Sequence, residues 1–168
     1  MTVRSRLALL AWMLASVLAS TLAGCPGPGS NDGGPDVYVE PELEIGTGEG
    51  VFTPFEDGTT LSIVPGTQGA QHIWIAVRTR GLAAQANLID LVLTRDRDAA
   101  QVSDPYTVRV SLVPMGDHAE FVGLTLIVPD PAQAIGEDLT LRATVTDRDG
   151  RSVAGERHIR ADWAPGEL

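Results

Sequence analysis

Few residues in this chain carry side chains suited to catalysis or metal binding. There is one cysteine, Cys25, and there are three histidines, His72, His118 and His158. A thiol can act as a nucleophile or accept an acyl group, and an imidazole can bind a metal or transfer protons. Cys25 closely follows an apolar run, so the residues before it decide what its thiol can do.

The first 24 residues have the three-part pattern of a secretory signal peptide. Arg4 and Arg6 give a positive start, residues 7–18 are almost wholly apolar, and small residues lead up to the cysteine. The apolar run is shorter than the roughly 20 residues of a membrane-spanning helix. Leu22-Ala23-Gly24-Cys25 resembles the lipobox of bacterial lipoproteins, in which the cysteine becomes the lipid-bearing N-terminus. The alternative is an uncleaved N-terminal anchor helix.

The resemblance implies that Cys25 holds the protein to a membrane through fatty acyl chains. One chain binds a membrane only marginally, whereas several chains on one residue make a stable anchor. The residue after the cysteine is Pro26, not the aspartate associated in some bacteria with retention at the inner membrane, so the resemblance favours the outer membrane. With its thiol consumed by the lipid, the chain has no cysteine left for a disulfide.

Composition divides the chain into three parts: a signal peptide (1–24), a flexible tether (25–41) and a folded domain (42–168). The tether is rich in proline, glycine and acidic residues, which cannot form a core. Removal of residues 1–24 takes away two arginines and no acidic residue, so the formal charge changes from −10 to −12. Such an acidic chain repels phosphates, and we expect no nucleic-acid partner.

The domain shows apolar alternation with a period of two and no amphipathic helix. In residues 72–80, Ile73, Ile75 and Val77 alternate with His72 and Trp74, which places the first set in the core and the second on the solvent face. Strands of this kind are predicted at 43–46, 51–55, 59–64, 72–80, 87–94, 106–113, 121–128, 139–146 and 153–163.

This pattern predicts an all-β fold. About seven to nine strands over little more than a hundred residues favour an immunoglobulin-like antiparallel β-sandwich, with a partly open barrel as the alternative. Residues from 42 onward, and 65–80 in particular, also resemble uncharacterised lipoproteins of bacteria, which have no known function to transfer.

The most distinctive local sequence runs from Gly66 to His72. Two glycines around a polar pair suit a bulge or a loop, and Gln68, Gln71, His72 and Trp74 together could form a polar and aromatic binding patch. The structural alternative is a corner between two strands, with Trp74 covered by a neighbouring loop.

Metal binding and catalysis have weaker support. Asp96 and Asp98 are the calcium candidates, but the full calcium-loop pattern is absent, and Asp149-Gly150 is explained by a hairpin turn. The histidines lack the close spacing of a metal site, and no hydrolase, phosphate-loop or metalloprotease motif occurs. We therefore expect no cofactor and no enzymatic activity.

Two functions remain open. The first is a non-catalytic structural or interaction module, anchored at the envelope, that binds a protein or a glycan. The second is a periplasmic sensor that binds a small molecule or a metal.

Lipidation can be tested in growing cells with a labelled fatty-acid analogue. The wild-type protein should take up the label and Cys25→Ser should not, because serine has no thiol to carry the lipid. The variant should also migrate at the size of the unprocessed precursor. Equal labelling of the two proteins would contradict the assignment of Cys25.

Overall fold

The computed structural model describes residues 39–66 and 69–166. Over these ranges the protein is almost entirely β-structure, with one short 3-10 helix, η1 (Pro131–Gln133). No helix in the described ranges is long and apolar enough to cross a membrane. Cys25 and the residues before it lie outside these ranges.

The described residues form eleven strands, of which eight have five residues or more and three have two. They are β1 (Glu42–Thr47), β2 (Thr53–Pro54), β3 (Thr59–Pro65), β4 (Gln71–Arg80), β5 (Asn87–Arg95), β6 (Ala100–Gln101), β7 (Tyr106–Val110), β8 (Val113–Pro114), β9 (Ala119–Ile127), β10 (Asp138–Thr146) and β11 (Ser152–Trp163). The all-β prediction is confirmed, and the eight longer strands match the number expected from sequence.

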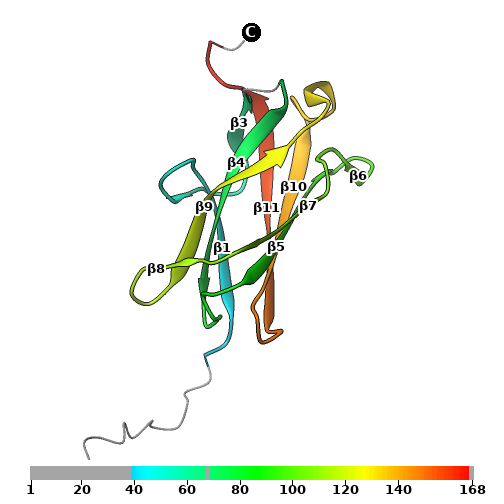
Figure 1. Cartoon of the computed structure of the whole chain (residues 1–168). Coiled ribbons are helices and arrows are strands. Elements are labelled where there is room, and N and C mark those ends of the chain that lie inside the picture. Colours follow the sequence, from blue (N-terminus) through cyan, green and yellow to red (C-terminus); the bar gives the residue numbers. More distant parts are fainter. Residues whose placement is uncertain (1–38, 67–68, 167–168) are drawn as a thin grey trace, which may run out of the picture. The chain divides into compact units, whose positions relative to one another are not determined.

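The strands form two layers packed face to face, as Figure 1 shows. β9, β4 and β1 make one layer, and β11, β10, β5 and β7 make the other. β3 belongs to both, because it pairs antiparallel with β4 at one end and parallel with β11 along the rest of its length. The β3–β11 pair is the single parallel exception among the described strands. Strands that pass between layers in this way form the corners of sandwiches.

The core lies between the layers and consists of the inward positions of each strand. The largest fully buried side chains are Ile45, Ile63, Ile73, Ile75, Ile89, Leu91, Leu93, Leu124, Leu126, Leu139, Leu141 and Ile159. These are aliphatic groups whose burial stabilises the fold by about 1.5–3 kcal/mol each before entropy is counted. The alternation predicted for β5 and β10 is therefore confirmed.

Two predicted strands are shorter in the structure. Within residues 51–55 only Thr53 and Pro54 pair with β1, and Phe52 is buried on the outer face of the layer, beneath the Arg78 guanidinium. The strand predicted at 106–113 ends at Val110, and the next pairing is β8 with β9. A hairpin joins β8 to β9, in which the Met115 amide donates to the His118 carbonyl at 2.8 Å.

Asp147 fixes the turn between β10 and β11 and is itself buried. One carboxylate oxygen accepts from the amides of Asp149 and Arg151, both at 2.9 Å, and the other accepts from Ala83 at 3.2 Å. Burial raises the pKa of Asp147, but these amide hydrogen bonds and the charge of Arg151 outweigh it, so the net pKa is lowered. The turn therefore depends on an ionised aspartate.

Asp147→Asn should lower the free energy of unfolding by about 1–3 kcal/mol, because one or more buried amides lose their acceptor. The loss should be seen at neutral pH by urea denaturation. It should shrink as the pH falls from about 4, the ordinary pKa of an aspartate in the unfolded chain, toward the lowered pKa of folded Asp147, because the unfolded chain then takes up a proton that the folded carboxylate resists. Asp149→Asn is the control; its carboxylate is exposed, and we expect a change of about 0.5 kcal/mol or less. Equal losses in the two variants would contradict this role.

Candidate functional site

The three described residues of the predicted binding patch do not form one surface. Gln68 lies outside the described residues. Gln71 lines a pocket of about 500 Å³ at one end of the sandwich, together with Pro131 and Trp163. Trp74 instead lines a groove on the outer face of the β9–β4–β1 layer.

His72 is buried, with 8% of its surface exposed, so the prediction that it faces solvent is wrong. Its ring packs edge-on against Trp74, with 4.6 Å between the ring centroids and an interplanar angle of 89°. Its Nε2 atom has no hydrogen-bond partner among the described residues. Burial lowers the pKa of His72, and the charge of Glu49 offsets only part of that effect.

The groove forms where the hydrogen-bond ladder along β4 is interrupted. β3 pairs with β4 as far as Ile73, and β1 begins to pair at Ala76, so Trp74 lies between the two. The side-chain hydroxyl of Thr47 fills this gap by donating to the Trp74 carbonyl at 2.6 Å. The chain between β1 and β3 leaves the layer here and forms one wall of the groove.

A bulge in β9 contacts the start of the segment between β1 and β3. Gly123 has φ 79°, and the β4–β9 register shifts at this point. Its amide donates to the Gly48 carbonyl at 3.0 Å. A Cβ at Gly123 would lie 2.8 Å from the Glu49 carbonyl oxygen, so only glycine lets the loop approach this closely. The predicted alternative placed Trp74 under a neighbouring loop. The structure has such a loop beside Trp74, and Trp74 also lines the groove.

The groove has a volume of about 330 Å³ and no charged side chain in its lining. Trp74, Phe55 and Val64 supply apolar surface, and Thr60 and Ser62 present hydroxyl groups. Thr60 and Ser62 occupy outward positions of β3 and are exposed. Neither these β3 residues nor Phe55 were predicted from sequence as site residues, although Thr60 and Ser62 alternate with Leu61 and Ile63, a pattern that indicates a row of outward hydroxyls.

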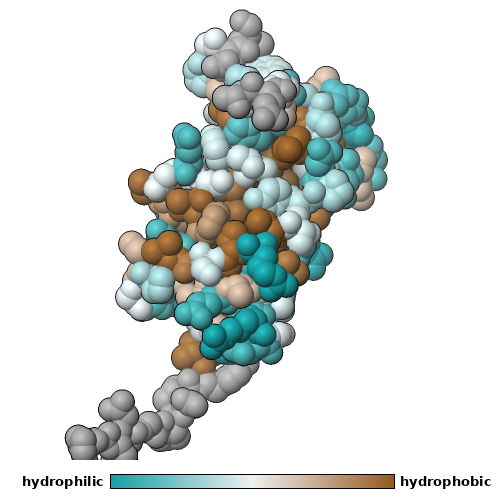
Figure 2. Space-filling model, in the orientation of Figure 1, coloured by the Kyte–Doolittle hydropathy of each residue, from teal (hydrophilic) through white to brown (hydrophobic). Residues whose placement is uncertain are grey.

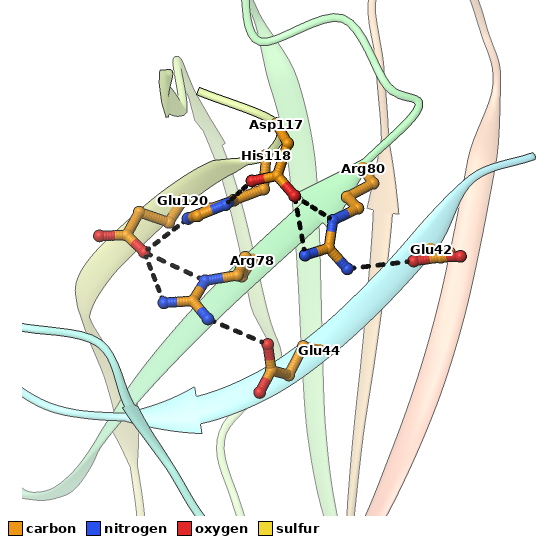
Figure 3. Close-up of polar contacts among 7 residues, drawn as sticks. All are labelled: Glu42, Glu44, Arg78, Arg80, Asp117, His118 and Glu120. Atoms are coloured by element: carbon orange, nitrogen blue, oxygen red, sulfur yellow. Dashed lines mark hydrogen bonds and ion pairs between the residues drawn. The ribbon is translucent and has the colours of Figure 1, made fainter. Parts of the chain in front are cut away.

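Arg78 lies on the same outer face but is occupied by contacts within the protein (Figure 3). It lies 3.2 Å from both Glu44 of β1 and Glu120 of β9. Its guanidinium also stacks over the Phe52 ring at 4.0 Å, a favourable cation–π distance. These contacts tie the loop after β1 to the layer beneath it.

Arg80 continues this network toward the end of β4. It lies 3.4 Å from Glu42 and 3.1 Å from Asp117, and His118 Nδ1 lies 2.8 Å from the same aspartate. The hydrogen bond from His118 and the charge of Arg80 lower the pKa of Asp117. The network joins β1, β4 and the β8–β9 hairpin, and its charges are paired with one another, so we assign it a structural role.

The calcium candidates Asp96 and Asp98 use their carboxylates in separate contacts. Asp98 pairs with Arg95 at 2.8 Å, and this hydrogen bond is the main cause that lowers the pKa of Asp98 to about 2. Asp96 accepts from the Thr140 hydroxyl at 2.7 Å and lies 3.7 Å from His158. Within residues 39–66 and 69–166, no group of three or more histidine, cysteine, aspartate or glutamate residues is arranged to hold a metal.

The surface also shows where apolar residues are left in contact with solvent. Figure 2 shows hydrophobic residues across the middle of one face, with strongly hydrophilic residues toward the end at which the chain joins the domain. Val51, in the loop beside the groove, is 74% exposed. The groove therefore adjoins a loop with an exposed apolar side chain.

No protein-family model and no curated protein sequence matches this chain. Two solved structures are similar in part. The CooA pilin subunit from enterotoxigenic Escherichia coli has 13% identity and a TM-score of 0.37, over 73% of this chain and 99% of that one. A DUF4466 family protein from Parabacteroides merdae has 10% identity and a TM-score of 0.35, over 71% of this chain and 44% of that one. We draw no functional inference from either likeness.

Gly123→Ala should displace the loop that adjoins Trp74, whereas Gly116→Ala should not. Both glycines have positive φ, 79° and 81°, so both variants carry a backbone cost of about 1–2 kcal/mol. A Cβ at Gly116 meets no atom within 4 Å, whereas one at Gly123 meets the loop. We expect Gly123→Ala to cost about 1–3 kcal/mol more in urea denaturation and to change tryptophan emission. Identical results for the two variants would contradict the proposed contact.

The stability of the domain should depend on pH through His72. Because its folded pKa is lowered, the unfolded chain takes up a proton that the folded chain resists. The stabilisation from neutral His72 is complete above about pH 6.5 and is lost as the pH falls toward the folded pKa. Urea denaturation between pH 7 and 5 should therefore show a smaller fall for His72→Gln than for the wild type. His158→Gln, at an exposed site, should retain the wild-type fall; the same behaviour in His72→Gln would contradict this assignment.

Proposed function

We propose that this protein is an exported, lipid-anchored module of the bacterial cell envelope that binds a protein or a glycan and catalyses no reaction. The signal pattern and the lipobox resemblance around Cys25 support the export and the anchor. The outer membrane is the proposed location, because Pro26 follows the cysteine.

The observation that carries the binding role is the groove beside Trp74. Binding sites are commonly concave and apolar, with a few polar groups that orient the ligand, and this groove combines aromatic surface with exposed hydroxyls. The groove is built on paired strands, so its walls are held by the sandwich and do not have to be ordered when a ligand binds.

The position of the groove also suits a tethered domain. β1 begins at Glu42, which pairs with Arg80 at one end of β4, so the chain joins the domain at that end. Trp74 is the fourth residue from the other end of this ten-residue strand. A strand of this length spans about 30 Å, so the groove is about two-thirds of the strand away from the start of β1.

The second candidate function is a sensor for a small molecule. It is favoured by the pocket beside Trp163, whose volume is about 500 Å³ and whose lining includes Gln71, Asp130 and Pro131. This pocket lies at the end of the sandwich opposite to Glu42, because Gln71 begins β4 where Arg80 ends it.

The proposal can be tested by site-specific photo-crosslinking in intact cells that produce the full chain. A photoreactive amino acid at Thr60, in the groove, should form adducts with an envelope component. The same group at Arg142, an exposed site on β10 in the other layer, should not. Protease treatment and periodate oxidation of the Thr60 adduct then distinguish a protein from a glycan. No adduct at Thr60, or the same adducts at both sites, would overturn the binding role of the groove.

A further inference from the structure

The lining of the Trp74 groove is uncharged in a strongly charged protein. One residue in five of the whole chain is charged, 20%, yet no Asp, Glu, Lys, Arg or His lines this groove. A charged ligand placed here would lose water without gaining an opposite charge, which is costly. The acidic remainder of the domain adds a general repulsion against anions. The groove therefore selects for a neutral ligand.

The Thr47 hydroxyl of this lining is bonded to the Trp74 carbonyl, but three other hydroxyls in it are available to a ligand. Thr53, Thr60 and Ser62 are exposed, and none of their side chains forms a hydrogen bond with another described residue. A hydroxyl can donate one hydrogen bond and accept others, so a row of them matches a ligand that also carries donors and acceptors together. Hydroxyl groups of a sugar have this property.

Its apolar surface is aromatic and held in place. The Trp74 ring is fixed by its edge-on contact with His72, and Phe55 lies in the same lining. A pyranose ring presents a face of C–H groups with hydroxyls around its rim. A fixed indole beside free hydroxyls complements both parts of such a ring.

An extended peptide is a poorer match for this groove. Peptides that add to a sheet edge use free backbone groups of the edge strand. Within the gap between β1 and β3, the Trp74 carbonyl already accepts from the Thr47 hydroxyl at 2.6 Å. The edge of β4 is thus closed to strand addition at this acceptor, while the side-chain hydroxyls remain available.

We infer that the ligand of the Trp74 groove is a neutral carbohydrate, bound with a sugar face against Trp74 and its hydroxyls on Thr60 and Ser62. This inference rests on the proposed function, because it names the class of ligand for the same groove. The volume of about 330 Å³ is near the lower end of small-molecule sites, so the groove holds a short segment of a glycan.

The test uses the processed protein, purified from membranes in a detergent without a sugar headgroup. Cellobiose, maltose and N,N′-diacetylchitobiose are titrated separately, with 3′-sialyllactose as the anionic comparison, and binding is followed by calorimetry and tryptophan emission. At least one neutral disaccharide should saturate below about 10 mM and bind at least tenfold more tightly than sialyllactose. The sequence has three tryptophans, of which Trp12 lies in the expected signal peptide. Trp163→Phe should therefore keep the emission change, and Trp74→Phe should lose it.

The paired substitution Thr60→Val and Ser62→Ala should weaken binding at least tenfold without changing the melting temperature by more than a few degrees, since both sites are exposed. Thr144→Val, an outward position of β10 in the other layer, is the matched control and should bind as the wild type does. Failure of all three neutral disaccharides to saturate, or wild-type affinity in the paired variant, would overturn the inference. A protein adduct at Thr60 in the crosslinking experiment, together with no saccharide binding, would retain the proposed function and reject the carbohydrate.

Discussion

The hydrogen bonds along one edge of β4 are divided between two other strands, and much of the structure depends on this division. β3 takes the start of the edge and β1 takes the end, because the chain between them leaves the layer. β3 can then continue beside β11 and join the two layers. The same division leaves Trp74 without a ladder partner on this side, and the groove occupies that place.

The outer face of β4 illustrates what strand alternation can and cannot predict. The buried positions Ile73, Ile75 and Val77 were predicted from sequence, because a period of two assigns side chains to opposite faces. The burial of His72 was not predicted, because alternation does not say what covers each face. His72 is covered by Trp74 and by residues near Gly66. These contacts depend on how the chain folds back in three dimensions, which strand alternation does not describe.

The candidate site shows the same limit of prediction from sequence more clearly. Trp74 could be selected from sequence as an aromatic residue on an outward position, but Phe55 could not be associated with it, since no local pattern shows how the segment between β1 and β3 folds back. The bulge at Gly123 was also not predicted. A single glycine in an apolar strand is visible in the sequence, but Gly48, which its amide contacts, lies 75 residues earlier in the chain. Fold class follows from local periodicity, whereas the groove is a product of long-range packing.

The way in which the chain joins the domain determines how the domain would bear mechanical load. The Val39 carbonyl accepts a hydrogen bond from Arg151 at 2.6 Å, and β1 follows with five consecutive antiparallel partners on β4, from Glu42 opposite Arg80 to Gly46 opposite Ala76. Tension drawn along β1 acts in shear, so the bonds between β1 and β4 resist it together instead of opening one after another. The ion pairs of Arg78 and Arg80 cross the same boundary. A pull on the chain that precedes β1 would thus be transmitted into β4, the strand that also carries Trp74.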